Sequence, residues 1–222
     1  MRKIALLLAG LICSLSAHAE FVTFEYTGII NTLREYSGTR DKAVASSNIV
    51  PGSVRVGDSY HGSFTVDTGV QPYVGSAPGS AFYFDWTGVS PRATDFIMDK
   101  SGTSISTPNI TTVYVVNGTY DSVYIGAASG LFSSFTLGFT DLTGTALSGL
   151  AIPLAYDLDA WYTAEAGMTW STADGSARVM MNGMLTSITR VSPVPEPATY
   201  ALFLAGVALV SGVAARKRKQ AV

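Results

Sequence analysis

One stretch of the chain reads Gly57-Asp58-Ser59-Tyr60-His61-Gly62-Ser63-Phe64-Thr65-Val66-Asp67. Successive side chains of a β-strand point to opposite faces, so this stretch separates into two sets. One face carries Tyr60, Gly62, Phe64 and Val66, and the other carries His61, Ser63, Thr65 and Asp67. The alternation predicts a strand with one face in a core and the other in water.

The same kind of pattern extends over residues 20–191 and predicts a β-protein. Segments rich in aromatic and β-branched residues are separated by Gly, Pro, Asn and Asp, and no long amphipathic helix interrupts them. The predicted strands are 21–30, 59–67, 82–88, 94–99, 111–116, 119–127, 133–140, 154–163, 168–172 and 177–191. Their number and spacing predict an all-β fold, a single antiparallel β-sandwich of jelly-roll-like type, with long loops at 34–57 and 69–81.

Three dipeptides indicate how the strands are connected. Asn117-Gly118 has the residues of a type I′ turn and predicts a hairpin, and Asp174-Gly175 predicts a second one. Asn182-Gly183 fits either a turn or a long strand with a glycine bulge.

The charge distribution limits the classes of partner. Eight basic and fifteen acidic side chains lie between residues 20 and 193, whereas six of the fourteen basic residues lie at the two ends of the chain. Nucleic-acid binding depends on Lys and Arg placed against phosphates, so an acidic body excludes nucleic acid as an expected partner. Cations or neutral glycans fit better.

Residues 1–19 have the three parts of a secretory signal peptide. Arg2 and Lys3 precede an apolar stretch, and Ala17-His18-Ala19 forms a small-x-small cleavage site. The expected partners are the Sec translocon and signal peptidase, with cleavage after Ala19 and before Glu20. The single cysteine, Cys13, would leave with the signal, so no disulfide, thiolate nucleophile or cysteine-ligated metal is expected in the mature chain.

Residues 198–215 contain no charged side chain and would form a helix of about 27 Å, enough to cross a bilayer core. Four positive charges follow directly, Arg216, Lys217, Arg218 and Lys219. Such a cluster acts as a stop-transfer signal and stays on the cytoplasmic side. We therefore expect a membrane helix with the body outside and the tail inside.

The segment before this helix is rich in proline and reads Ser192-Pro193-Val194-Pro195-Glu196-Pro197. Prolines at this density hold the backbone extended and accessible to a protease. The combination of Val194, Pro195, Glu196 and Pro197 with the apolar helix and the basic tail resembles the PEP-CTERM sorting signal. The chain therefore divides into a signal peptide (1–19), an ectodomain (20–191) and a sorting signal (192–222).

That resemblance implies recognition of Pro195, Glu196 and Pro197 by an exosortase, a membrane-embedded protease of Gram-negative bacteria. The precursor would be anchored in the inner membrane with its ectodomain in the periplasm, and processing would release it to the cell surface or extracellular matrix. In that family the signal accompanies exopolysaccharide production and biofilm formation.

Chemical motifs are absent from the body. The sequence contains no Gly-x-Ser-x-Gly elbow, no His-Glu-x-x-His, no phosphate loop and no dinucleotide fingerprint. The prediction is therefore no catalytic residue, no cofactor and no metal site, with calcium considered only because Asp157 and Asp159 would share one face of a predicted strand. Asp95 and Asp99 would share a face in the same way, and the one histidine of the mature chain, His61, is predicted to be a polar strand residue.

Trp86, Trp161 and Trp170 fit either a sugar-stacking platform or the core of a sandwich. The function expected from these features is a non-catalytic surface or matrix protein that associates with exopolysaccharide. Two alternatives stay open. One is a secreted polysaccharide hydrolase or lyase that uses an Asp or Glu pair, and the other is a structural or adhesive ectodomain that remains anchored in the membrane.

Overall fold

The computed structural model of the protein describes residues 21–74, 78–84, 94–107, 112–129 and 133–191. Its elements are β1 (Phe21–Ser37), β2 (Arg40–Ala43), β3 (Ser46–Ser47), β4 (Val54–Arg55), β5 (Ser59–Asp67), β6 (Tyr73–Val74), β7 (Ser80–Tyr83), β8 (Thr94–Met98), β9 (Ser104–Thr107), β10 (Thr112–Asn117), β11 (Asp121–Ser129), β12 (Ser133–Asp141), the 3₁₀ helix η1 (Leu158–Ala160), β13 (Thr163–Ser171) and β14 (Ala177–Val191).

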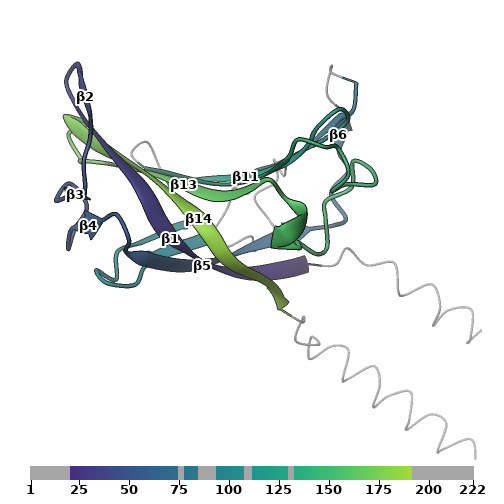
Figure 1. Ribbon diagram of the computed structural model, residues 1–222, viewed down its shortest axis with the longest axis horizontal. Coiled ribbons are helices and arrows are strands. Elements are labelled where there is room, and N and C mark those ends of the chain that lie inside the picture. The colour runs from purple at the N-terminus through teal and green to yellow at the C-terminus, as the bar shows by residue number, and fades with distance from the viewer. Residues whose placement is uncertain (1–20, 75–77, 85–93, 108–111, 130–132, 192–222) are drawn as a thin grey trace, which may run out of the picture. The chain divides into compact units, whose positions relative to one another are not determined.

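Twelve strands form one antiparallel sheet in the order β6-β7-β10-β11-β12-β13-β14-β1-β5-β8-β9, with β2 paired to the end of β1. The sheet bends on itself, so that β11, β12 and β13 lie opposite β1 and β5 (Figure 1). The all-β, antiparallel prediction is confirmed, and the arrangement is sandwich-like because one bent sheet supplies both layers. The jelly-roll-like expectation is not met, since β10 to β14 follow one another as a meander and not as paired Greek keys.

Two long strands carry the bend. The 17-residue β1 and the 15-residue β14 pair along most of their length, and register shifts occur between Thr27 and Gly28 and between Ile30 and Thr32. Such irregularities increase the local twist and bend of a strand. The pair therefore runs from one layer into the other.

Two glycines face the core inside this bend. A Cβ atom built on Gly28 would lie 2.2 Å from the Tyr60 ring, and one built on Gly183 would lie 2.4 Å from it. Tyr60 is buried, with 1% of its surface exposed, and its ring fills the space that two side chains would otherwise need. We call Gly28 and Gly183 the glycine gap.

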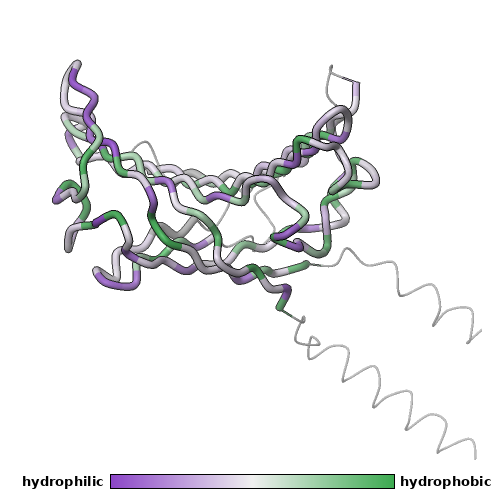
Figure 2. Tube along the Cα trace, viewed as in Figure 1, coloured by the Kyte–Doolittle hydropathy of each residue, from purple (hydrophilic) through white to green (hydrophobic). Residues whose placement is uncertain are grey.

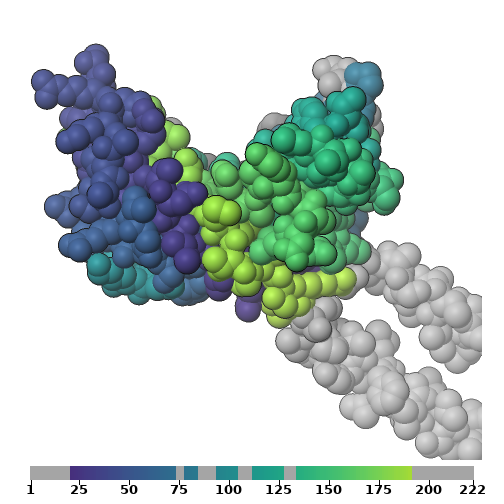
Figure 3. Space-filling model, viewed as in Figure 1, coloured from purple at the N-terminus to yellow at the C-terminus, as the bar shows by residue number. Residues whose placement is uncertain are grey.

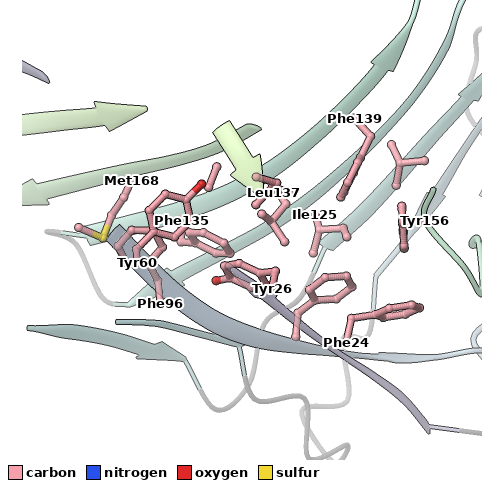
Figure 4. Close-up of a cluster of buried hydrophobic side chains, with 14 of the residues drawn as sticks. Phe24, Tyr26, Tyr60, Phe96, Ile125, Phe135, Leu137, Phe139, Tyr156 and Met168 are labelled. Atoms are coloured by element: carbon pink, nitrogen blue, oxygen red, sulfur yellow. The ribbon is translucent and has the colours of Figure 1, made fainter. Parts of the chain in front are cut away.

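The core lies between the two layers and is largely aromatic (Figure 4). Tyr26 of β1 stacks on Phe135 of β12 with ring centroids 5.8 Å apart, and Phe139 stacks on Tyr156 at 4.5 Å. The Tyr26 hydroxyl donates to the backbone oxygen of Asp95 at 2.6 Å. Burial of these rings supplies the main stabilisation of the fold, because each aromatic side chain removes a large apolar area from water.

Hydrophilic residues gather at the turn between β1 and β2 (Figure 2). There Arg34 forms an ion pair with Asp41, and its Nε atom donates to Oδ1 of Asp41 at 3.0 Å. Arg178 of β14 lies over the Tyr36 ring, with 4.4 Å from its Cζ atom to the ring centroid. Residues 34–57 were expected to form a long loop, but they hold the end of β1 and strands β2, β3 and β4.

Both predicted hairpins are present, although the first uses a different turn. β10 pairs with β11, and β13 pairs with β14. Asn117 is the last residue of β10 and pairs with Asp121, so the loop spans residues 118–120, and neither Asn117 nor Gly118 has a positive φ angle. The side chain of Asn117 instead donates to the backbone oxygen of Leu147 at 3.2 Å, a contact with a distant loop that favours this geometry.

Other strand predictions need correction. β14 runs through Asn182 and Gly183 as a long strand, whereas 154–163 is not a strand. That segment is a loop with the short helix η1, because Asp157 caps the turn through its side chain. The predicted loop 69–81 contains β6 and the start of β7.

Within the part of the chain that the structure describes, no helix has the length and apolar character needed to cross a membrane. The predicted signal peptide and the predicted membrane helix at 198–215 lie outside the described residues, as does most of the predicted strand 82–88. The division of the chain into three parts stays a prediction.

Replacement of Gly28 by Ala should destabilise the fold by about 3 kcal/mol, because overpacking of a filled core has a cost of this order. The new methyl group would lie 2.2 Å from the Tyr60 ring and 2.5 Å from the backbone oxygen of Met184. Urea unfolding followed by tryptophan fluorescence measures the effect. Gly149→Ala is the matched control, because a Cβ there meets nothing within 4 Å. Equal stability of the two variants would show that the glycine gap does not limit the packing.

Candidate functional site

The outer face of strands β10 to β13 is concave. Figure 3 shows a hollow between a lobe that holds the early part of the chain around β2 and a lobe that holds residues of the β10–β11 and β12–β13 connections. Strands β11 and β13 form the floor between the two lobes (Figure 1). The inward side chains of the same strands, such as Leu137 and Phe139, belong to the core, so the outward side chains face this hollow.

One row of side chains crosses this outer face, with one residue from each of eight neighbouring strands. Direct register pairs place them next to one another in the order Tyr73, Phe82, Tyr114, Tyr124, Gly138, Glu165, Met184 and Ile29. We call these eight residues the cross-strand row. Four of them, Tyr73, Tyr124, Met184 and Ile29, are exposed by 75%, 47%, 56% and 46%. Several large exposed apolar side chains along one row indicate an interaction surface.

The first half of the row is aromatic. The rings of Phe82 and Tyr114 have centroids 6.3 Å apart, and those of Phe82 and Phe84 are stacked at 6.2 Å. A shallow hollow of about 550 Å³ lies beside them and is lined by Gln71, Pro72, Tyr73, Phe82 and Phe84. Phe82 is half-buried and contacts the rings of both Tyr114 and Phe84.

The Tyr124 ring occupies the space above a glycine. A Cβ atom built on Gly138 would lie 3.3 Å from Cε1 and 3.5 Å from Cδ1 of Tyr124. A side chain at position 138 would therefore displace the ring. Glycine at this point of β12 lets Tyr124 lie across the neighbouring strand and keep part of its surface open to solvent.

The rest of the concave face is small and nearly uncharged. Outward positions next to the row hold Gly126, Thr136, Gly167 and Thr169. Among the described outward residues of β10 to β13, Glu165 is the one charged side chain. The face therefore offers aromatic rings, hydroxyl groups and one carboxylate.

A second depression lies on the outer face of β1, β5 and β8, with a volume of about 450 Å³. Glu25 and Asp95 both pair in register with Ser63, one from each side, and all three line the depression together with His61. The Ser63 hydroxyl donates to Asp95 at 3.4 Å. The structure thus brings two carboxylates to one face, a pair that the sequence did not nominate.

His61, predicted as a polar strand residue, lies on this face and bonds through Nδ1 to the carboxylate of Asp99. Ser59 donates to the same carboxylate, and the pKa of Asp99 is lowered, first by the hydrogen bond from Ser59 and also by His61. Since both partners bond to Asp99, the cluster does not have the serine–histidine–aspartate order of a nucleophilic triad. Asp95 lies within β8 and accepts from Ser63, whereas Asp99 follows the end of β8 and bonds to Ser59 and His61. The two carboxylates therefore have different partners.

The other acidic pair is arranged differently from the prediction. Asp157 and Asp159 belong to the turn around η1 and not to a strand face, and the Asp157 carboxylate accepts from the backbone N–H of Asp159 at 3.2 Å. Among the described residues, no group of three or more His, Cys, Asp and Glu side chains is placed to hold a metal ion. The calcium hypothesis gains no support from this pair.

Neither of the two described tryptophans belongs to an exposed platform. Trp161 is buried and its ring lies 5.6 Å from Phe139, while Trp170 is half-buried against the core. Trp86 lies outside the described residues. The aromatic surface consists instead of tyrosines and phenylalanines, which sequence reasoning missed because their alignment depends on the pairing of strands distant in the chain.

The residues predicted for export and sorting lie outside the described part of the structure: Ala17, Ala19 and Glu20 at the signal cleavage site, Val194, Pro195, Glu196 and Pro197 in the processing motif, and Arg216, Lys217, Arg218 and Lys219 in the basic tail. These residues therefore do not enter the description of the site.

Two buried aspartates hold the loop at one end of the concave face. Asp121 and Asp141 pair in register, and Asp121 accepts from the backbone N–H of Leu147 at 2.7 Å. The Asp141 carboxylate accepts from the backbone N–H groups of Thr143 at 2.9 Å and Thr145 at 2.8 Å. These hydrogen bonds, first of all the one from Thr143, hold the pKa of Asp141 well below its usual value of 3.8.

Comparison with known proteins identifies one region. Residues 193–219 match the PEP-CTERM protein-sorting motif, which confirms the resemblance seen in the sequence. The match supports an exported, membrane-anchored precursor that an exosortase sorts to the cell surface. No curated protein matches the chain.

Replacement of Asp141 by Asn should lower the thermal midpoint of unfolding at pH 7, because the charged acceptor of the loop is lost. The folded-state pKa of Asp141 is depressed, so its contribution to stability is complete above the ordinary pKa of 3.8 and disappears as the pH falls through the folded-state value. The difference between the wild type and the variant should therefore shrink below pH 3.8. Calorimetry across this range measures it, and a difference independent of pH would contradict the assigned role.

Proposed function

We propose that this protein is a non-catalytic surface or matrix protein that an exosortase delivers and that associates with exopolysaccharide. The observation that carries the proposal is the sorting motif at residues 193–219. A Pro-Glu-Pro segment, an apolar stretch and a basic tail form an export and processing signal that has no role in the chemistry of a folded body. Delivery outside the cell is therefore the first function of the chain.

The route follows from the order of these signals. The Sec translocon and signal peptidase act on residues 1–19, and the stretch 198–215 then holds the precursor in the inner membrane of a Gram-negative cell with its body in the periplasm. Cleavage at the segment around Val194, Pro195, Glu196 and Pro197 releases the body to the surface or the biofilm matrix.

The surface of the body supports association with polysaccharide. The described outward residues of β10 to β13 present rings, hydroxyl groups and one carboxylate, and they include no Lys or Arg of the kind that nucleic-acid binding requires. Aromatic rings next to hydroxyl groups suit a ligand that has apolar C–H faces and many hydroxyls, which is the chemistry of a sugar chain.

Replacement of Pro195, Glu196 and Pro197 by Ala should abolish processing and keep the protein in the membrane fraction. Intact mass and fractionation of the native protein test this. The wild type should lack both residues 1–19 and the tail, and should co-fractionate with exopolysaccharide at the surface or in the medium. The exosortase proposal is wrong if the tail persists in the wild type and the variant localises identically, and the protein is then a permanently anchored structural or adhesive ectodomain.

The second candidate function is polysaccharide cleavage, by hydrolysis or by the elimination reaction of a lyase, at the depression that Glu25 and Asp95 line. Two carboxylates on one sheet face are the minimum that a glycosidase needs. This candidate predicts that the purified wild type releases reducing or unsaturated ends from the producer's own polysaccharide and that Glu25→Gln and Asp95→Asn each lower the rate by at least about 100-fold. The non-catalytic proposal predicts no release by any of the three proteins.

A further inference from the structure

We propose that the cross-strand row is the binding site for a single chain of a neutral polysaccharide, which lies across the strands with sugar rings against Tyr73, Tyr114 and Tyr124. The inference rests on the proposed association with exopolysaccharide. It adds the location of the site, the direction of the bound chain and the charge class of the sugar.

The shape of the surface favours a chain-like ligand. Each strand contributes one member to the row, and the members are register partners. At β7 the apolar surface is wider, because Phe84 stacks on Phe82. Outward neighbours along the same strands, such as Gly126, Thr136 and Gly167, are small. A folded protein partner needs a broad apolar patch, whereas along β11 to β13 the row is a narrow line bordered by small and hydroxyl-bearing residues.

The spacing of the row fits a sugar polymer. Neighbouring strands lie about 4.8 Å apart, so successive rings advance by roughly that distance across the sheet. This advance is close to the length of one sugar unit in an extended hexose chain. Tyr73, Tyr114 and Tyr124 lie on strands β6, β10 and β11 and can therefore face sugars along one chain. Phe82 of β7 is half-buried between Tyr73 and Tyr114.

The positions of the rings are fixed before binding. Tyr124 lies above Gly138, which has no side chain to lift the ring, and Tyr114 lies against Phe82 at 6.3 Å between centroids. A ring that is already held in place loses little conformational freedom when a ligand binds. The aromatic part of the row is therefore a preformed surface.

The charges select the class of polysaccharide. The one charged member of the row is the carboxylate of Glu165, and the part of the chain between residues 20 and 193 carries eight basic and fifteen acidic side chains. A polyanion such as a uronic acid polymer would meet repulsion from Glu165, and the described outward residues of β10 to β13 include no Lys or Arg to offset it. Glu165 instead accepts hydrogen bonds from the hydroxyl groups of an uncharged sugar, as do Thr136 and Thr169.

Affinity electrophoresis of the protein purified from its producing cells tests the site. The gels contain a neutral glucan (hydroxyethyl cellulose, laminarin or dextran) or the polyanion alginate. At least one neutral glucan should retard the wild type and alginate should not. Tyr124→Ala and Tyr73→Ala should each weaken the apparent affinity by about tenfold, because each removes a ring that the bound sugar covers. Tyr124→Phe keeps the ring and should keep the affinity within about threefold.

The chain supplies matched controls for both tyrosines. Tyr120 is 46% exposed, as Tyr124 is 47% exposed, and Tyr162 is 73% exposed, as Tyr73 is 75% exposed, but neither control belongs to the row. Tyr120→Ala and Tyr162→Ala should therefore leave the affinity unchanged. Because all four side chains are exposed, their removal leaves the core intact, and equal thermal midpoints verify this.

The outcomes separate the site from the proposed function. Binding of the wild type with equal losses in row and control variants overturns the site and leaves the association in place. Retardation by alginate but not by the neutral glucans overturns the charge class and the site as described. Absence of retardation in every gel overturns the inference, and co-fractionation of the native protein with exopolysaccharide then decides separately whether the association holds.

Discussion

The packing of Tyr60 into the glycine gap is the contact on which the rest of the structure depends. Gly28 and Gly183 lie inside the bend of β1 and β14, where a Cβ on either would lie within 2.4 Å of the Tyr60 ring. Without those side chains, the long pair of strands passes from one layer to the other and the ring fills the space between them. One continuous sheet can therefore supply both layers around the core.

The bend determines both faces of the sheet. Inward residues of β1, β5 and β12 meet in an aromatic core, in which Tyr26 stacks on Phe135. The outward residues of the curved strands gather on a concave surface, because side chains alternate between the faces. The same register that packs the core therefore aligns the cross-strand row, and a slip of one residue would bury the row and expose the core.

Sorting and the proposed sugar binding involve separate parts of the chain. The motif at residues 193–219 concerns sorting, whereas the concave face belongs to β10 to β13 and the cross-strand row runs from Tyr73 of β6 to Ile29 of β1. The body also keeps buried carboxylates such as Asp141 for its own loops, where backbone N–H groups satisfy them. Glu165 is the one charged residue among the described outward residues of β10 to β13, and such a face suits the uncharged sugars that we propose as ligands.

The sequence by itself determined the class of fold and the sorting signal. Alternation in residues 57–67, the two hairpins and the Pro-Glu-Pro signal all depend on neighbours in the chain, and such local patterns are readable without a structure. The turn at Asn117 and the loop at Asp157 departed from the prediction because contacts with distant segments and side-chain caps decided them. The single bent sheet, the pairing of Glu25 with Asp95 across Ser63, and the line of Tyr73, Phe82, Tyr114 and Tyr124 were decided only by the tertiary structure, because strand register joins residues that lie far apart in the sequence.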